Sequence, residues 1–540
     1  MPPPREYASS VYSECPPSYA TIDPALARPS SADFSAPYRV GGKLASFVTL
    51  DQTKRHLKLL AAFRRLRQQI EDDPNLPSWI AHLSSQERWS VFVAIAVTRL
   101  EGYLKMLKSN QICVPPLDVG LVLHTWQLNP GRFEEDVFDQ GYDQSTLSNL
   151  LECFADSIDA STLKQQTSRF DVETWERIVG QPYDPLRRLE SDMNIVLTDR
   201  RTHETMTVPC IGPYGLGYAQ DGFAFASSSG DSWTHERMGV LKLAQRLRLL
   251  HLLVSSIDRL LGTMDNAAES LTDNLNFERS DLIYARIRES SIVRSATSEF
   301  DLAEKLSWSL QGARRFLAKE LGLKAPAIDR ITSCYTRRGP FSLDLVAATL
   351  RQGTFIEKMH GLGWLNPGRF EENDTVLRQS IARYHNFMDL LSSDSGITCV
   401  PTLDIDLIWH THQLSIRYRH DMFRFVGRFV DHDDSIEGTI LKYRFQDTAT
   451  AWEKRFHTSY SNNRLSGSHV RPPGFFGRQF GSTVLLPNSG GDRAILNGVD
   501  ARRESSRLEL RTSSSTSNNT GSHTYTHYGA GGCGGGGCGG

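Results

Sequence analysis

Two carboxylates and two imidazoles stand close together in the segment Leu403–Leu414, which reads LDIDLIWHTHQL. Asp406 and His410 are four residues apart, so on a helix their side chains share one face. A carboxylate and an imidazole on one face could bind a metal ion or act as an acid–base pair. His412 is turned about 200° from His410, because a helix turns about 100° per residue. The two histidines therefore cannot both bind one ion on a regular helix.

A hydrolytic site is one interpretation of this box. His420 and Asp421 follow it, and the acidic run 431–434 lies a little further along the chain. Such a series of His and Asp on helices resembles the ligand sets of helical metal-dependent phosphohydrolases. The catalytic candidates are then Asp406, His410, His420 and Asp421. A metalloprotease H-E-x-x-H, a P-loop, a G-x-S-x-G elbow and a dinucleotide-binding G-x-G-x-x-G do not occur in the sequence.

A structural role is the interpretation that we favour, because the box occurs twice. The segment CVPPLDVGLVLHTWQL, which begins at Cys113, aligns without a gap with CVPTLDIDLIWHTHQL, which begins at Cys399. The first copy has Gly120 where the second has Asp406, so a metal site of this design could not form there. What the copies share fits a common architecture, in which the carboxylate near the helix start caps the helix and the shared histidine is buried against a polar partner. The predicted structural motif comprises Asp118, His124, Asp404, Trp409, His410, His412 and Gln413.

The similarity continues upstream, where TRLEGYLKML resembles ARYHNFMDLL after a gap of two residues. We therefore predict a duplicated helical hairpin, in which an amphipathic helix is followed by a Val-Pro loop and a second helix. The octapeptide LNPGRFEE also occurs twice, at Leu128–Glu135 and Leu365–Glu372, but in a different register from the hairpin. Its Asn-Pro-Gly predicts a turn, and its acidic residues suit the first turn of a helix. We interpret it as one helix–turn–helix corner used twice.

The periodicity along the chain predicts a mainly α fold made of two helical modules. Apolar residues recur at helical spacing through most of the chain, while residues 193–229 are rich in Thr, Val and Gly in short alternating pieces. Both ends lack periodicity and have the composition of disordered segments. The predicted organisation is a disordered leader (1–42), an N-terminal helical module with the first hairpin (43–190), a small β-containing insert (191–232), a C-terminal helical module with the second hairpin (233–460), and a disordered tail ending in a Gly-rich segment (461–540).

The totals exclude several classes of function. The 540 residues carry a formal net charge of −2, so no basic surface predicts nucleic acid as a partner. We find no signal peptide, and the best apolar run is too short to span a bilayer. Eight cysteines without a C-x-x-C pair indicate reduced thiols in an intracellular, cytoplasmic protein. Two imidazoles and two thiols of the tail could hold a metal ion, although its many glycines make closure costly: His523, His527, Cys533 and Cys538.

The box together with RYHNFMDLL, PFSLDLVAATLRQGTFIEKM and the glycine-rich end resembles the glycine-rich domain-containing protein family of plants and fungi, with the fungal branch closest. The resemblance extends over residues 48–460. It implies a mainly helical fold around a domain of unknown function and no established reaction. We therefore expect a non-catalytic interaction or regulatory scaffold with an unidentified protein partner and no cofactor. The alternative is the metal-dependent hydrolase with a divalent ion at the box, and a third option is RNA binding through the Gly-rich tail.

Overall fold

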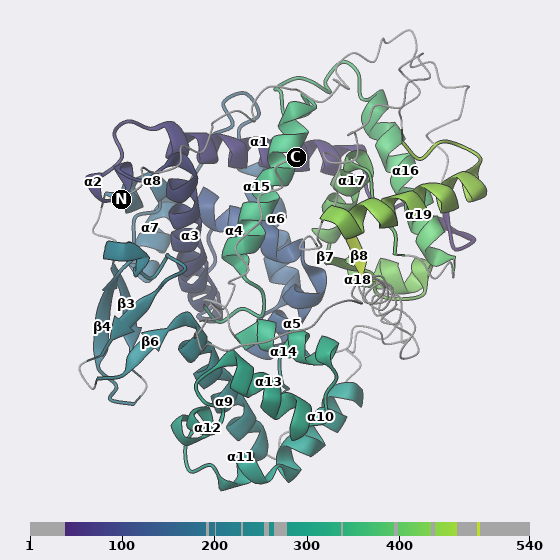
Figure 1. The fold of residues 1–540 in the computed structure, drawn as a ribbon. Coiled ribbons are helices and arrows are strands. Elements are labelled where there is room, and N and C mark those ends of the chain that lie inside the picture. Colours follow the sequence, from purple (N-terminus) through teal and green to yellow (C-terminus); the bar gives the residue numbers. More distant parts are fainter. Residues whose placement is uncertain are drawn as a thin grey trace, which may run out of the picture.

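The computed structural model describes residues 38–190, 194–199, 201–227, 230–252, 259–263, 278–335, 339–393, 398–433, 438–461 and 483–485. Helices dominate this part of the chain, and its named strands all belong to two-stranded antiparallel ribbons. The helices gather into three bodies, each with its own hydrophobic core (Figure 1). The predicted mainly α fold is confirmed.

The first body is built on two long helices, α1 (Leu50–Asp72) and α3 (Ser85–Lys108). At the start of α1 the Thr49 side chain accepts a hydrogen bond from the Gln52 amide, and the Gln52 side-chain oxygen accepts one from the Thr49 amide. This reciprocal cap satisfies two amides that a helix start leaves open. Around the two helices lie α2 (Ser78–Ala81), α4 (Leu117–Gln127), α5 (Pro130–Gln140), α6 (Gln144–Asp156), α7 (Arg169–Val179), α8 (Pro185–Leu189) and, from much later in the chain, α15 (Leu345–Gly361).

The second body is a bundle of shorter helices, which lies at the bottom of Figure 1. Its core is mainly aliphatic and includes side chains that are completely buried, among them Leu247, Leu302 and Leu317. The bundle therefore has an apolar centre separate from that of the first body. Its helices are α9 (His235–Leu252), α10 (Glu278–Glu289), α11 (Ser291–Ser295), α12 (Glu299–Lys305), α13 (Leu310–Lys319) and α14 (Ala325–Tyr335).

The third body combines the two ends of the described chain. Its elements are β1 (Tyr38–Val40), β2 (Lys43–Ala45), α16 (Thr375–Ser392), α17 (Leu403–Gln413), α18 (Tyr418–Asp421), the π-helical turn η3 (Met422–Val426), β7 (Asp431–Asp433) and α19 (Gly438–Phe456). The β1–β2 ribbon lies on α16, where the Gly41 amide donates to Asp389 Oδ1 at 3.0 Å. Just after the ribbon, the Phe47 amide donates to His385 Nε2 at 3.0 Å.

The ends of the chain correct two predicted boundaries. Residues 38–42 were predicted to belong to the disordered leader, but they form β1 and its turn, because Val40 is completely buried against the third body. The predicted disordered tail includes the strand β8 (Thr483–Leu485), which pairs with β7. Three residues are too few for a periodic pattern, so this pairing could not be predicted from the sequence. The rest of the leader and nearly all of the tail lie outside the described residues.

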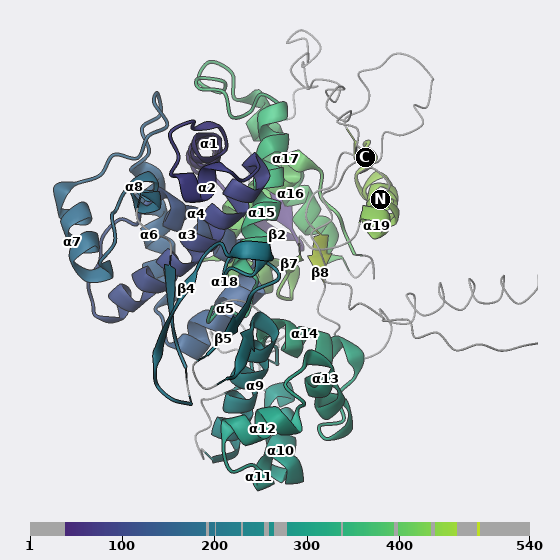
Figure 2. The same cartoon turned by 60° about the vertical axis from the view of Figure 1, so that its left-hand side comes forward.

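The β-containing insert was predicted over residues 191–232, and the strands of this region run from Asn194 to Thr234. It consists of two ribbons, β3 (Asn194–Thr198) with β4 (Thr205–Pro209) and β5 (Ala224–Ala226) with β6 (Ser232–Thr234). Along β3 and β4 buried or half-buried side chains alternate with exposed ones, as expected for a ribbon with one covered face. The insert lies between the first body and the α9–α14 bundle in both views (Figures 1 and 2).

Residues 233–460, which we predicted as one C-terminal module, contribute to all three cores. Helices α9–α14 form the second body, α15 packs on α1, α3 and α4 of the first body, and α16–α19 build the third. Helix α15 belongs to the first body because its buried residues Phe355, Ile356 and Met359 are part of the first core. The boundaries of independently folding units stay a prediction.

Candidate functional site

The two boxes lie on two helices of equal length, α4 (Leu117–Gln127) and α17 (Leu403–Gln413). Each follows a longer helix, α3 or α16, and packs against it. Equivalent residues therefore occupy equivalent places, with His124 and His410 both in the last turn and completely buried. The predicted duplicated helical hairpin is present in the structure.

An arginine from the first helix of each hairpin binds the first carboxylate of the box. Arg99 Nε lies 2.6 Å from Asp118 Oδ2, and Arg383 Nε lies 2.7 Å from Asp404 Oδ2. The side chains of the first pair are 1% exposed, while those of the second are 15% and 18% exposed. Burial raises the pKa of Asp118, and the Arg99 guanidinium opposes that rise. The carboxylates at the helix starts are thus primarily ion-pair partners and not the simple caps that we predicted.

The two copies also share contacts with α7 and α19, two helices that the sequence comparison did not include. Arg99 lies over the ring of Trp175, and the hydroxyl of Tyr183 donates to the Val114 carbonyl at 2.9 Å. In the second copy Arg383 lies over Trp452, and the hydroxyl of Tyr460 donates to the Val400 carbonyl at 2.7 Å. The signal in the sequence is a Trp-Glu pair followed by Tyr eight positions after the Trp, which occurs in both copies. The repeat unit is therefore larger than a hairpin.

The shared histidine of each box pairs with a histidine from another element. His124 Nε2 lies 2.9 Å from His56 Nε2 of α1, and the other ring nitrogen of His56 lies 2.9 Å from Thr411 Oγ1 of α17. Burial lowers the pKa of His56 to about 3 and holds that of His124 well below its usual value. Both rings are therefore neutral near pH 7, and one ring donates while the other accepts. The prediction that the shared histidine has a polar partner fits this geometry.

In the second copy the shared histidine belongs to a three-membered cluster. His410 Nε2 lies 3.1 Å from His432 Nε2 of β7 and 3.5 Å from Asp406 Oδ1. His432 Nε2 lies 4.0 Å from the same carboxylate oxygen, and all three side chains are 0% exposed. Burial holds the pKa of His410 well below its usual value, with the neighbouring histidines adding to the effect. Within the described residues these three groups can converge on one metal ion.

The other catalytic candidates do not join this cluster. His412 is buried on the opposite side of α17, where its ring stacks on Phe47 and its Nδ1 lies 2.8 Å from the Tyr384 hydroxyl. Its Nε2 lies 3.3 Å from Asp421 Oδ2, so Asp421 serves His412 and not His410. His420 is 46% exposed and lies beside Asp421. His410 and His412 therefore lie on opposite sides of α17, as their spacing in the sequence predicted.

The remaining residues of the box pack inward. Trp409 is completely buried, and its Nε1 donates to the Tyr418 hydroxyl at 2.9 Å. Gln413 is buried beside the same tyrosine. The tail candidates His523, His527, Cys533 and Cys538 lie outside the described residues.

The octapeptide LNPGRFEE has two conformations. In the first copy it opens α5, as predicted, with Gly131 inside the helix. The second copy forms turns instead, with Gly368 at φ +73°, and the next helix begins only at Thr375. The prediction that both copies open a helix is therefore wrong for the second. Its polar residues are exposed, and only Leu365 and Phe370 are buried.

The first copy connects the three bodies. On one side the Gly131 amide donates to Asp431 Oδ1 at 3.0 Å, and Glu134 Oε2 accepts from Arg419 at 2.7 Å. The space beside Gly131 is filled, since a Cβ there would lie 2.6 Å from Asp431 Oδ2. These contacts fix α5 to the segment that carries β7.

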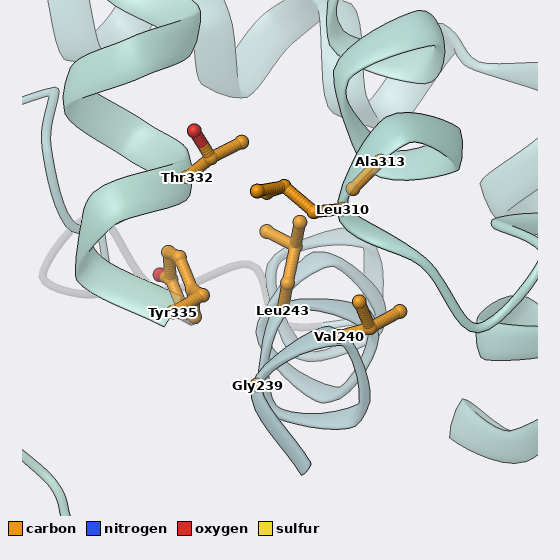
Figure 3. Close-up of a pocket in the computed structure, with 7 residues that line it drawn as sticks. All are labelled: Gly239, Val240, Leu243, Leu310, Ala313, Thr332 and Tyr335. Atoms are coloured by element: carbon orange, nitrogen blue, oxygen red, sulfur yellow. The ribbon is translucent and has the colours of Figure 1, made fainter. Parts of the chain in front are cut away.

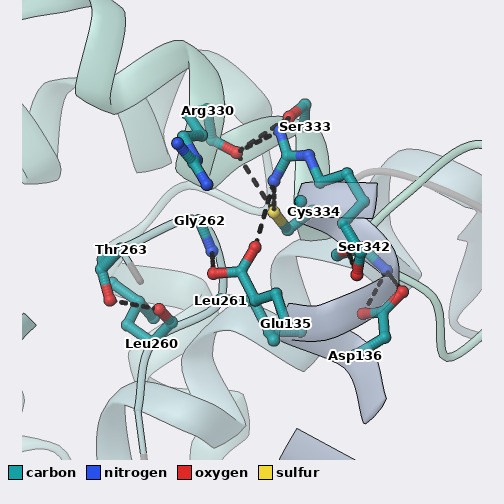
Figure 4. A network of polar contacts seen from close by, with 12 residues as sticks. Glu135, Asp136, Leu260, Leu261, Gly262, Thr263, Arg330, Ser333, Cys334 and Ser342 are labelled. Carbon is teal, nitrogen blue, oxygen red and sulfur yellow. Dashed lines mark hydrogen bonds and ion pairs between the residues drawn. The ribbon is translucent and has the colours of Figure 1, made fainter. Parts of the chain in front are cut away.

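On its other side α5 contacts the α9–α14 bundle and the segment before α15 (Figure 4). Arg132 Nη1 lies 2.7 Å from Cys334 Sγ, and Glu135 Oε1 accepts from the Gly262 amide at 2.5 Å. Asp136 accepts from the Ser342 amide at 2.9 Å. We predicted a corner at this octapeptide but missed its role as a joint between bodies.

A small pocket lies inside the bundle, between α9, α13 and α14 (Figure 3). Its polar lining groups already have partners in the protein, because Thr332 Oγ1 donates to the Ile328 carbonyl and the Tyr335 hydroxyl accepts from the Leu261 amide. The other lining residues are apolar or glycine: Gly239, Val240, Leu243, Leu310 and Ala313. The polar side chains that line the pocket are thus already engaged in hydrogen bonds within the protein.

Residues 314–421, which include the second box but not His432, match the family described as "Glycine-rich domain-containing protein-like". Two relatives from Arabidopsis thaliana, "Glycine-rich domain-containing protein 2" and "Glycine-rich domain-containing protein 1", are 36% and 35% identical over 129 residues. The match covers 22% of this chain in each case, and 15% and 14% of the relatives, so the chain spans a small part of their length. No solved structure matches the chain. Among the described helices none combines the length and the apolarity that crossing a membrane requires.

Proposed function

The chain carries the glycine-rich domain-containing protein-like segment at residues 314–421, and from this premise we propose that it is a non-catalytic intracellular scaffold that binds a protein partner. The observation that carries the proposal is the inward orientation of the box. Asp406, His410 and His412 are all 0% exposed. A catalytic group must touch its substrate, and these groups touch only other residues of the chain.

The joint at α5 supports the proposal, because a scaffold has to hold its surfaces in fixed relative positions. Glu134 binds Arg419 of the third body, while Glu135 binds the Gly262 amide beside the second. Both carboxylates are buried, so the ion pair and the hydrogen bond are shielded from solvent.

The loop of the β-containing insert is the surface that we assign to the partner. Gln220 Oε1 accepts from the amides of Gly212 and Gly217 and thereby closes the loop between them. At its tip Tyr214 is 97% exposed and has a φ of 58°, a left-handed conformation that is unusual for a bulky residue. Exposed tyrosines are frequent anchors of protein interfaces, and an outlier held by its surroundings points to a function.

Site-specific photo-crosslinking tests the proposal. A photoreactive phenylalanine analogue replaces Tyr214 in the full chain, and the control carries it at Tyr443, which is 67% exposed on α19. We expect the variant at position 214 to give one discrete adduct in extracts of the source cells, and the variant at 443 to give none. The same adducts from both positions, or none from either, would contradict this surface.

The alternative function, a metal-dependent hydrolase that uses the box, is tested with the same protein. We expect purified wild-type chain with added Zn²⁺ or Mn²⁺ to hydrolyse an activated phosphodiester no faster than a His410→Asn variant. Turnover that is present in the wild type and lost in the variant would replace the scaffold with the hydrolase.

A further inference from the structure

We propose that Asp406, His410 and His432 bind one divalent ion of the zinc class, and that this ion has a structural role. The proposal goes beyond the scaffold function and does not depend on it. The donor set is one that zinc accepts, with two imidazole nitrogens and one carboxylate oxygen.

The distances between the donor atoms fit an ion better than direct hydrogen bonds. Donors at zinc-bond distance around a tetrahedral ion lie about 3.3–3.5 Å apart. The three distances here are 3.1 Å between the imidazoles and 3.5 and 4.0 Å from Asp406 Oδ1 to His410 and His432. The two carboxylate distances exceed the range of a good hydrogen bond, which ends near 3.2 Å. Shifts of a few tenths of an ångström would therefore place all three donors around one ion.

Burial also favours a cation. A carboxylate that is 0% exposed is costly unless a positive charge or hydrogen bonds compensate for lost water. A divalent ion bound by Asp406 would be such a positive charge. Complete burial points to a structural ion, because catalytic zinc keeps a position open to water and substrate.

The two copies of the box differ in whether a carboxylate fits at the position of Asp406. At the position of Asp406 the first copy has Gly120, where a Cβ would lie 2.2 Å from the Phe154 ring. A carboxylate cannot fit there, and His124 pairs with His56 of α1 instead. The second copy has room for a carboxylate and receives its second imidazole from β7, which Asp431 fixes to α5 through the Gly131 amide.

The ion would tie β7 to α17 and so close the third body. His432 lies 22 residues after His410, beyond α18 and the π-helical turn η3. Besides the ion, this connection is held by the Asp431–Gly131 bond, by the Tyr418 hydroxyl, which donates to the Val430 carbonyl at 2.7 Å, and by apolar packing.

Metal analysis of the full chain tests the proposal. The protein is purified without a metal-affinity step, dialysed, and assayed for zinc by mass spectrometry before and after reconstitution with one equivalent of Zn²⁺. We expect about one zinc per chain in the wild type. His432→Asn and Asp406→Asn should retain less than a tenth of that amount. His124→Asn, which changes the equivalent buried histidine of the first copy, should retain all of it.

Two further measurements separate ligand loss from misfolding. Co²⁺ reconstitution should give the visible absorption of a tetrahedral site in the wild type and in His124→Asn, and not in His432→Asn. A chelator should lower the melting temperature of the wild type and leave that of a folded His432→Asn unchanged. A wild type that binds no zinc after reconstitution would overturn the proposal. Zinc that persists in His432→Asn but is lost in Cys533→Ser would place the ion in the tail and would overturn it as well.

Discussion

At the scale of single residues, two buried carboxyls of α5 should make the stability of the protein depend on pH. Burial raises the pKa of Asp136 to about 8, although the Ser342 amide and the Trp126 indole donate to it. Burial also raises the pKa of Glu134 to about 7, although Arg419 lies 2.7 Å away. Asp136 therefore holds a proton in the folded protein at pH values where the unfolded chain has released it, and Glu134 does so over a narrower range because Arg419 favours its charged form.

The resulting stability is present below the ordinary carboxyl pKa and is lost as the pH rises through the folded value. We predict that the free energy of unfolding falls by roughly 2 kcal/mol between pH 6 and pH 8 through Asp136 alone. Asp136→Asn, which resembles the protonated acid, should remove that part of the fall. Urea unfolding of both proteins at the two pH values measures the difference. An equal fall in both would show that Asp136 is not protonated in the folded state.

Sequence spacing identified Asp406 and His410 as neighbours because four residues on a helix fix the geometry. It could not identify His432 or His56. Those histidines reach the box from β7 and from α1, and their approach depends on how α5 and α1 pack. Local periodicity contains no information about such contacts.

At the scale of elements, the duplicated unit repeats an ion pair at two degrees of burial, and this allows a matched comparison. The Arg99–Asp118 pair is 1% exposed on both sides, whereas the Arg383–Asp404 pair is partly exposed. We predict that Arg99→Met lowers the free energy of unfolding by about 3–5 kcal/mol, because it leaves a buried carboxylate without its cation. Arg383→Met should cost less, about 1–3 kcal/mol.

Chemical unfolding followed by circular dichroism measures both variants. Asp118→Asn added to Arg99→Met should recover part of the loss, because it removes the uncompensated charge. Equal costs for the two arginines, or no recovery in the double variant, would contradict the assignment of the difference to burial.

Among the elements, the hairpin was predictable and the octapeptide was not. Sixteen aligned residues carry enough of the core pattern to fix α4 and α17 in the same form. Eight residues do not fix a conformation by themselves. The first LNPGRFEE becomes helical where Phe133 packs against Trp126 and its acids find partners, and the second forms turns at the surface. Tertiary contacts decide between the two.

At the scale of the whole molecule, the sequence predicted helices but not their division into three bodies. Helix α15 follows the α9–α14 bundle in the chain yet completes the core of the first body, and the β1–β2 ribbon packs on α16 about 340 residues later. Both assignments depend on pairings between distant segments. Helix α5 contacts both of the other bodies, so we expect it to influence whether the molecule opens in parts or as a unit.

The repeated octapeptide supplies a control for that joint, because Arg132 and Arg369 occupy the same place in its two copies. Arg132 donates to Cys334 and Ser333 of α14, whereas Arg369 is exposed. We predict that Arg132→Ala weakens the attachment of the bundle, so that amide protons of α14 and of residues 259–263 exchange at least tenfold faster with solvent. Amides of α17 should keep their protection, since the contacts of the third body with α5 pass through Gly131 and Glu134. Hydrogen–deuterium exchange followed by mass spectrometry measures all these segments in one experiment. Arg369→Ala should exchange like the wild type. If both variants accelerate the same segments, the effect comes from lost charge and not from the joint.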